Sequence, residues 1–169
     1  MPATLTSTLT ISALTQLVEA LDLSSRRNDQ NYSKSWSLAS GVGANQADKI
    51  FHDQRTIAAS GTDSLDLAGV LTDVFGATIT FARIKAVIVV AASGNINNVN
   101  VTRPASNGVP LFLAPGAGIP VRPGGAFMWV APDATGVVVT GATGDLLDIV
   151  NSAGSTSVTF DIIVIGASA

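Results

Sequence analysis

The pattern of hydrophobic and polar positions changes twice near the beginning of the chain. Residues 3–12 alternate Leu or Ile with Thr or Ser, and this period of two predicts an extended N-terminal arm or edge strand. Residues 13–23 carry apolar side chains at helical spacing, and Ser12 is placed to cap the first turn. The apolar positions are Leu14, Leu17, Val18 and Leu21. We therefore expect one short helix directly after the arm.

Residues 24–54 contain almost no apolar run, so the sequence predicts an irregular connection there, with a short strand near residues 35–39. The change to a strand-rich pattern falls between Gly41 and Arg55. We expect two parts. Residues 1–54 would hold the arm, the short helix and the irregular connection, and residues 55–169 would form a β-sandwich domain.

Residues 56–169 consist of short β-branched and apolar runs, with turn residues about every 8–12 positions. This spacing is typical of β-sandwiches, jelly rolls and barrels. Residues 77–92 predict a central strand, and Val158–Ile165 predicts another strand that is buried on both faces. The expected fold class is therefore all-β: a jelly-roll-like β-sandwich with an extended N-terminal arm and one short helix.

Composition favours a protein that works within an assembly. Charged residues make up 12% of the chain and hydrophobic residues 47%, whereas an ordinary globular chain carries roughly 25% charged residues. A monomer with so few charges has little with which to cover its surface, so we expect a homo-oligomer or an assembly component. The net charge of −3 does not fit the basic surface of a nucleic-acid-binding protein.

The sequence also limits the cellular context. There is no Cys, so neither a disulfide framework nor a thiolate metal site is expected. The N-terminal residues make a poor signal peptide. The longest apolar run, Ala86–Ala92, is far shorter than the roughly 20 residues of a membrane helix. We expect a soluble protein that is made in a cytoplasm.

The sequence gives only weak indications of a nucleotide-binding loop and of a catalytic histidine. "GVGANQ", beginning at Gly41, has Gln46 where a nucleotide-binding loop needs its last glycine, and it does not follow a buried strand. His52 is the one histidine, and no nucleophile elbow accompanies it, although a Ser–His–Asp arrangement is formally possible. We interpret His52 as a surface or interface residue. One histidine also argues against a transition-metal site.

A second glycine-containing stretch, Pro123–Gly125, is interpreted as a turn that leads into a strand, because no Lys–Ser/Thr pair follows it. In that strand, Phe127 and Trp129 would face one side, and Met128 and Val130 the other.

The aspartates form two sets along the chain: Asp63, Asp66 and Asp73, and then Asp145 and Asp148. Calcium loops need oxygen ligands at tight, regular spacing with a closing Glu, and neither set meets this requirement. We expect Asp63 and Asp145 to be turn residues whose carboxylates accept hydrogen bonds from nearby backbone N–H groups.

Arg103 and Arg122 each precede a proline at the end of a predicted strand. Two interpretations stay open for them: an ion pair with a carboxylate of another chain, or an ordinary solvated surface position.

The order of four segments resembles a family of small structural proteins of tailed bacteriophages and prophages. The segments are "SLDLAGVLTDVFGATITFARIKAVIV", "PVRPGGAFMWVAPD", "GDLLDIVNSAG" and "VTFDIIVIGASA", and the similarity covers residues 55–169. The resemblance implies a virion component with a jelly-roll-like β-sandwich, often trimeric, that acts as a capsid decoration or cement protein. It implies no catalytic, cofactor-binding or metal-binding residues.

We therefore expect a viral structural protein that is not an enzyme and needs no cofactor. Its partners would be further copies of itself, with a trimer favoured, and the major capsid protein or other virion subunits. Nucleic acid and membrane are not expected partners. The protein would be located in the virion, which is assembled in the host cytoplasm, and the arm from about Pro2 to Ile11 would contact neighbouring capsid subunits.

Two alternatives remain open at this point. The protein could be a head–tail connector, tail or baseplate component. It could also be a carbohydrate-binding jelly-roll module for host attachment, in which case Trp36 or Trp129 would bind the sugar.

Overall fold

The computed structural model describes residues 4–169, and every regular element in this part of the chain is a β-strand. The strands are β1 (Ser7–Ala20), β2 (Ser25–Ser40), β3 (Gln46–Ala47), β4 (Lys49–Ile57), β5 (Thr62–Asp66), β6 (Arg83–Ala91), β7 (Val99–Thr102), β8 (Gly118–Val121), β9 (Ala126–Val130), β10 (Val137–Val138), β11 (Leu146–Asn151) and β12 (Val158–Ala167). The all-β class expected from the sequence is confirmed. The first residues of the expected arm, 1–3, lie outside the described part.

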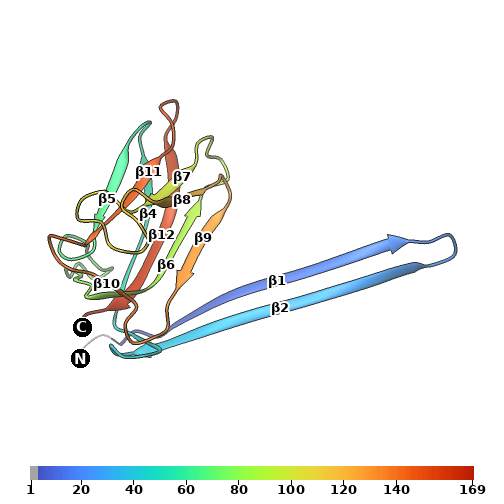
Figure 1. Cartoon of the computed structure of the whole chain (residues 1–169), viewed down its shortest axis with the longest axis horizontal. Helices are drawn as coiled ribbons and strands as arrows, with labels where there is room; N and C mark the ends of the chain where they lie inside the picture. Colours follow the sequence, from blue (N-terminus) through green and yellow to red (C-terminus); the bar gives the residue numbers. More distant parts are fainter. Residues whose placement is uncertain (1–3) are drawn as a thin grey trace.

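Two antiparallel sheets form the body of the protein (Figure 1). In the first, here called the β6 sheet, β4, β12 and β6 lie in this order, and β9 and β10 both pair with β6. In the second, here called the β11 sheet, the order is β5-β11-β7-β8. The expected central positions of the strands within residues 77–92 and 158–165 are confirmed, since β6 and β12 are flanked on both sides.

The two sheets share one hydrophobic core. Alternate residues of a strand point to the same face, so every second side chain of β12 enters this core. Phe160 and Ile162 of β12 meet Leu147 and Ile149 of β11 there, and all four side chains are almost fully buried. Burial of these apolar side chains holds the two sheets together in a sandwich-like arrangement.

β1 and β2 form a long two-stranded hairpin, here called the arm. It is paired without a bulge from Ser7↔Leu38 to Ala20↔Ser25. The 14 residues of β1 span ~46 Å at roughly 3.3 Å per residue. The arm leaves the body at one end and projects beyond it (Figure 1).

The helix expected over residues 13–23 is wrong. β1 continues through this segment to Ala20, and the chain then turns, with the backbone N–H of Leu21 donating to the carbonyl of Ser24. The apolar spacing is helical, but an exposed ribbon imposes no alternation, so Leu17 lies on one face of the strand while Leu14 and Val18 lie on the other. Pairing with β2 satisfies the backbone groups that a helix would have satisfied internally.

The irregular connection expected for residues 24–54 is instead largely extended. β2 occupies Ser25–Ser40 and includes the short strand expected near residues 35–39, and β4 begins at Lys49. An apolar run is not required for β2, because most of its residues are exposed on both faces of the arm. The expected domain boundary, between residues 54 and 55, falls within β4.

Replacing Leu147 by Ala is expected to lower the free energy of unfolding by about 2–5 kcal/mol, because it leaves a cavity in the core shared by the two sheets. Leu113→Ala is the matched control, since Leu113 is fully exposed, and its effect should stay within about 0.5 kcal/mol. Urea denaturation measures both values. Equal effects of the two substitutions would contradict the packing described here.

Candidate assembly surface

The two faces of the arm differ in character. Residues that lie opposite each other in an antiparallel pair project from the same face, so the register assigns every arm side chain to one of the two faces. The face here called the apolar arm face carries Leu9, Ile11, Ala13, Leu17, Tyr32 and Trp36, and between them the polar residues Thr15, Glu19, Arg26, Asn28, Gln30 and Lys34. The other face carries mostly Thr, Ser and Asn side chains together with Leu14 and Val18.

The apolar arm face is buried at the body and exposed beyond it. At the root of the arm, Leu9 and Leu38 are buried and Trp36 is partly buried. Further out, Leu17 is 73% exposed and Tyr32 is 53% exposed. Large hydrophobic side chains at this level of exposure, repeated along one element, are typical of a surface that a partner covers.

The root packs on the outer face of the β6 sheet, which is the face turned away from the shared core. Leu9, Trp36 and Leu38 belong to a second hydrophobic cluster with residues of four neighbouring strands. These sheet residues, here called the root row, lie side by side in the register: Ile50, Ile165, Ala86 and Val130. The arm is therefore anchored by burial of apolar surface. Among the described residues, its strands pair with each other and with the short strand β3, and with no strand of the two body sheets.

A second row of the same sheet lies next to the root row and is less covered. Its residues, here called the outer row, are paired across the four strands in the same way: His52, Ile163, Ile88 and Met128. The three apolar members are partly buried and also pack against the cluster at the arm root, whereas His52 is exposed. Beyond them, Val90 is 38% exposed and Asp161 is exposed beside it. The outer row thus continues the apolar surface on which the arm is seated.

The tip of the arm carries charges that neutralise one another. Glu19 and Arg26 form an ion pair across the hairpin. The Arg27 Nε atom donates to the Asp29 carboxylate at 2.6 and 2.7 Å, and these bonds are the main reason why the pKa of Asp29 lies below its ordinary value. Overall, the arm has three acidic and three basic residues: Glu19, Asp22, Asp29, Arg26, Arg27 and Lys34. A neutral arm lacks the excess of positive charge that nucleic acids or acidic lipid surfaces attract.

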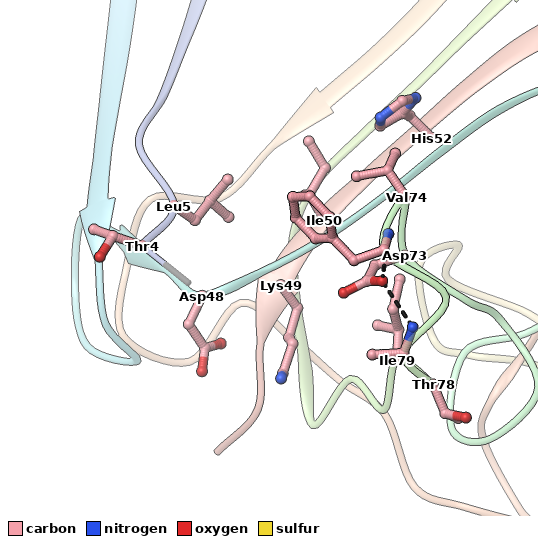
Figure 2. Close-up of a pocket in the computed structure, with 12 residues that line it drawn as sticks. Thr4, Leu5, Asp48, Lys49, Ile50, His52, Asp73, Val74, Thr78 and Ile79 are labelled. Carbon is pink, nitrogen blue, oxygen red and sulfur yellow. Dashed lines mark hydrogen bonds between the residues drawn. The ribbon is translucent and has the colours of Figure 1, made fainter. Parts of the chain in front are cut away.

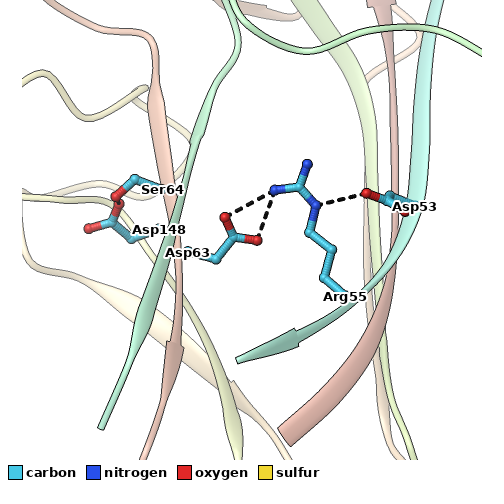
Figure 3. A network of polar contacts seen from close by, with 5 residues as sticks. All are labelled: Asp53, Arg55, Asp63, Ser64 and Asp148. Carbon is cyan, nitrogen blue, oxygen red and sulfur yellow. Dashed lines mark hydrogen bonds and ion pairs between the residues drawn. The ribbon is translucent and has the colours of Figure 1, made fainter. Parts of the chain in front are cut away.

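Arg55 links the edges of the two sheets (Figure 3). Its Nη1 atom donates to both carboxylate oxygens of Asp63 on β5, at 3.0 and 2.9 Å, and its Nε atom donates to Asp53 at 2.9 Å. The guanidinium also lies 5.3 Å from the centre of the Phe51 ring. Burial is the largest influence on the pKa of Arg55 and lowers it, but the two carboxylates together outweigh burial and raise the pKa. The expected turn role of Asp63 is therefore wrong.

The other aspartates act locally. The expected turn role of Asp145 is confirmed, because its carboxylate accepts the backbone N–H of Ala142 at 2.6 Å. Asp66 and Asp73 also accept nearby backbone N–H groups, whereas Asp148 accepts the Ser64 hydroxyl at 2.5 Å. The two sets predicted from the sequence do not converge. Among residues 4–169, no group of three or more His, Asp or Glu side chains is arranged to hold a metal ion.

His52 lies at one side of a cavity of about 390 Å³ between β4 and the loop before β6 (Figure 2). The cavity is lined by apolar side chains that include Leu5 and Ile50, together with Asp48, Lys49 and Asp73. Figure 2 shows that Asp73 is turned to the backbone of its own loop, where it accepts the N–H groups of Phe75 and Ala77. Within the described chain, no hydrogen bond joins His52 to a carboxylate or hydroxyl group, and no catalytic triad is assembled here.

Both glycine-containing stretches form ordinary turns. In the stretch from Gly41, the N–H of Gly43 donates to the side-chain oxygen of Gln46 at 2.8 Å, so the loop closes on itself. The interpretation of Pro123–Gly125 as a turn into a strand is confirmed, since it joins β8 to β9 and Gly124 has φ +72°.

The predicted arrangement of the β9 side chains is also confirmed. Phe127 and Trp129 face the core between the two sheets, whereas Met128 and Val130 face the side of the arm root. Trp36 packs at that root. Both indole rings are thus partly buried in hydrophobic clusters instead of forming an exposed stacking platform.

The two arginines that precede prolines differ. The Arg103 Nη1 atom donates to the carbonyl of Phe112 in its own chain at 3.0 Å, and the side chain is partly buried. Arg122 is exposed at the end of β8.

Reasoning from the sequence missed the length of the arm, and with it Leu17, Tyr32 and Lys34 as surface residues of one ribbon. A signal was present: no Gly, Pro, Asn or Asp interrupts the chain between Ser7 and Ala20, and "DLSS" follows as the first turn-forming stretch. The outer row had no comparable signal, because its residues come from four strands that only the fold brings together.

Replacing Asp63 by Asn is expected to lower the free energy of unfolding by about 1–2 kcal/mol, because the partly buried Arg55 loses its two-oxygen acceptor. Asp53→Asn is the control, since Asp53 is more exposed and accepts a single bond, and its effect should be below about 0.5 kcal/mol. Urea denaturation at low and high salt measures both. If both substitutions have the same effect, Arg55 does not link the sheets as described.

Comparison of the chain with protein-family models, with curated protein sequences and with solved structures finds no match. Residues 4–169 contain no helix long and apolar enough to cross a membrane. The case for a function therefore depends on the arm and on the surface that anchors it.

Proposed function

We propose that the protein is a structural subunit of a tailed-phage virion, and specifically a capsid decoration or cement protein that stabilises the shell. The observation that carries this proposal is the arm: a hairpin with 14 residues in its first strand, exposed along most of its length. An isolated two-stranded hairpin is at best marginally stable in water. An arm of this length is therefore best explained as an element that becomes ordered and covered among neighbouring subunits.

The fold of the body is proposed to be a jelly roll. A jelly roll can be described as a long antiparallel hairpin of eight strands that is folded over. The first strand then pairs with the eighth, the second with the seventh, the third with the sixth and the fourth with the fifth. The strand order β4-β12-β6-β9 opposite β5-β11-β7-β8 follows this scheme. Jelly rolls occur in viral shell proteins and in lectins, so the topology supports the virion proposal without excluding a binding module.

Two observations favour an assembly role over sugar binding. Trp36 and Trp129 are both committed to hydrophobic clusters, whereas sugar binding would use an exposed aromatic ring. The arm also carries large exposed hydrophobic side chains along its length, and Leu14, Leu17 and Leu23 are each more than 70% exposed.

The mechanism would be mechanical. Each copy would contribute a modest contact through its arm, and many copies on one lattice would add these contacts through high effective concentration. Such a protein holds shell subunits together and so opposes their separation by heat or by internal pressure. The same arm could serve in a connector, tail or baseplate. Copy number distinguishes these locations, because decoration requires hundreds of copies per particle and a connector about a dozen.

Shortening the arm is expected to abolish shell binding while the body stays folded. The variant joins Thr10 to Ser35 through an Asn-Gly turn, which closes a two-residue hairpin at a pair already present in the register. It keeps Leu9, Trp36 and Leu38 at the root. Shells that lack the protein are mixed with each form, and bound protein and the temperature of shell disruption are measured. We expect at least a tenfold loss of binding and no thermal protection.

Leu23→Ser is the control for this experiment, because it changes only the exposed turn at the tip of the arm. It should bind and protect like the unaltered chain. A shortened arm that binds and protects as well as the full arm would refute a role of the arm in the shell.

A further inference from the structure

We propose that the neighbour that receives the arm is a second copy of this chain, and that the apolar arm face lies across the outer row of that copy. This inference rests on the proposed role of the arm in assembly and names its partner. It concerns a surface composed of two parts of one sequence, the distal arm and the outer face of the β6 sheet.

The chain already makes the contact that is proposed between copies. At the root, Leu9 and Trp36 of the apolar arm face pack on the root row of the β6 sheet. The outer row lies two residues further along each strand, roughly 7 Å away, and presents Ile163, Ile88 and Met128 with their surface only partly covered. Apolar side chains are thus available both on the distal arm and on the outer row for a second contact of the same kind.

The distal arm cannot make this contact within its own chain. Leu17 lies eight residues beyond Leu9 in an unbroken strand, which places it roughly 26 Å from the root. Figure 1 shows the arm projecting away from the body over this length. The distal arm and the uncovered part of the outer row are therefore left for other molecules. Reciprocal exchange of arms satisfies both within a closed symmetric oligomer.

The charges of the two surfaces are complementary. Lys34 lies opposite Ile11 on the apolar arm face, is exposed, and forms no ion pair among the described residues. Asp161 lies beside the outer row and is also exposed, and within residues 4–169 its carboxylate accepts a hydrogen bond from Gln54 alone. One isolated positive charge on the arm thus has one negative charge on the body to meet, an arrangement that fixes register between partners.

The available area is close to what a stable contact requires. The arm from Ile11 to Ala20 is roughly 33 Å long and roughly 10 Å wide, so one flat face covers roughly 330 Å². A chain that lends one arm and receives another would bury roughly 660 Å² before the relief of the side chains is counted. Stable interfaces bury about 800 Å² per partner.

The first test measures the molar mass of the purified chain by sedimentation equilibrium from about 1 to 100 µM. We expect an oligomer whose dissociation constant rises at least tenfold in Leu17→Asn. Leu14→Asn is the matched control, since Leu14 and Leu17 are 74% and 73% exposed on opposite faces of the same strand. A wild-type chain that stays monomeric, or an equal effect of the two substitutions, would overturn the inference.

The second test reverses the two charges. Lys34→Glu and Asp161→Lys should each weaken association about fivefold, and the double variant should restore it, because every contact then contains the opposite pair. Both positions are exposed, so the variants should keep the thermal unfolding profile of the unaltered chain. Failure of the double variant to recover association would show that these two residues do not meet.

Cross-linking identifies the contact directly, because the chain contains no Cys. Lys34→Cys and Asp161→Cys chains are mixed and oxidised, and a disulfide between them requires the two Cβ atoms to come within about 4.5 Å. Leu14→Cys mixed with Asp161→Cys is the control and should give no specific product. Efficient cross-linking in the control alone, or in neither mixture, would count against the proposed contact.

The two proposals can fail separately. If the purified chain is monomeric but the shortened arm loses shell binding, the arm binds another virion protein, so the inference falls and the proposed function stands. If the chain assembles through its arm but the shortened variant still protects shells, the proposed function falls and the inference stands.

Discussion

Burial of a few apolar side chains at the arm root is the constraint on which the rest of the surface depends. Leu9, Trp36 and Leu38 fix the hairpin to the outer face of the β6 sheet. Without this contact the arm would be a two-stranded hairpin with no hydrophobic layer beneath it, and such a hairpin is at best marginally stable in water. The root contact sets the direction of the arm relative to the body. The exposed face of the arm and the outer face of the β6 sheet therefore meet at an angle.

The body can hold such an arm because the inner face of the β6 sheet is covered by the β11 sheet. Apolar side chains of both sheets pack together in the core, and Arg55 joins the sheet edges through Asp63. The β6 sheet therefore carries apolar residues on both faces, one for the core and one for the arm. This double use explains why β12 is apolar on both faces over its second half, from Ile162 to Ile165.

The sequence allowed the fold class to be predicted well, whereas the surface was predicted poorly. Core strands such as β6 and β12 were predictable because burial on both faces demands continuous apolar runs. The arm was misread because an exposed ribbon needs no such run, and because Leu14, Leu17 and Val18 are spaced as on one face of a helix. The contact of Arg55 with Asp63, and the alignment of Ile163 with Ile88, depend on strand order, which no local pattern encodes.

The position of the root row along the chain has a consequence for biosynthesis. The arm is translated before the body, but one of the side chains that seats it, Ile165, belongs to the last strand. During synthesis the hairpin must wait, without its support, until nearly all the body has been made. Chains interrupted before β12 would lack a seated arm as well as a closed core. The fold thus couples the seating of the arm to completion of the body.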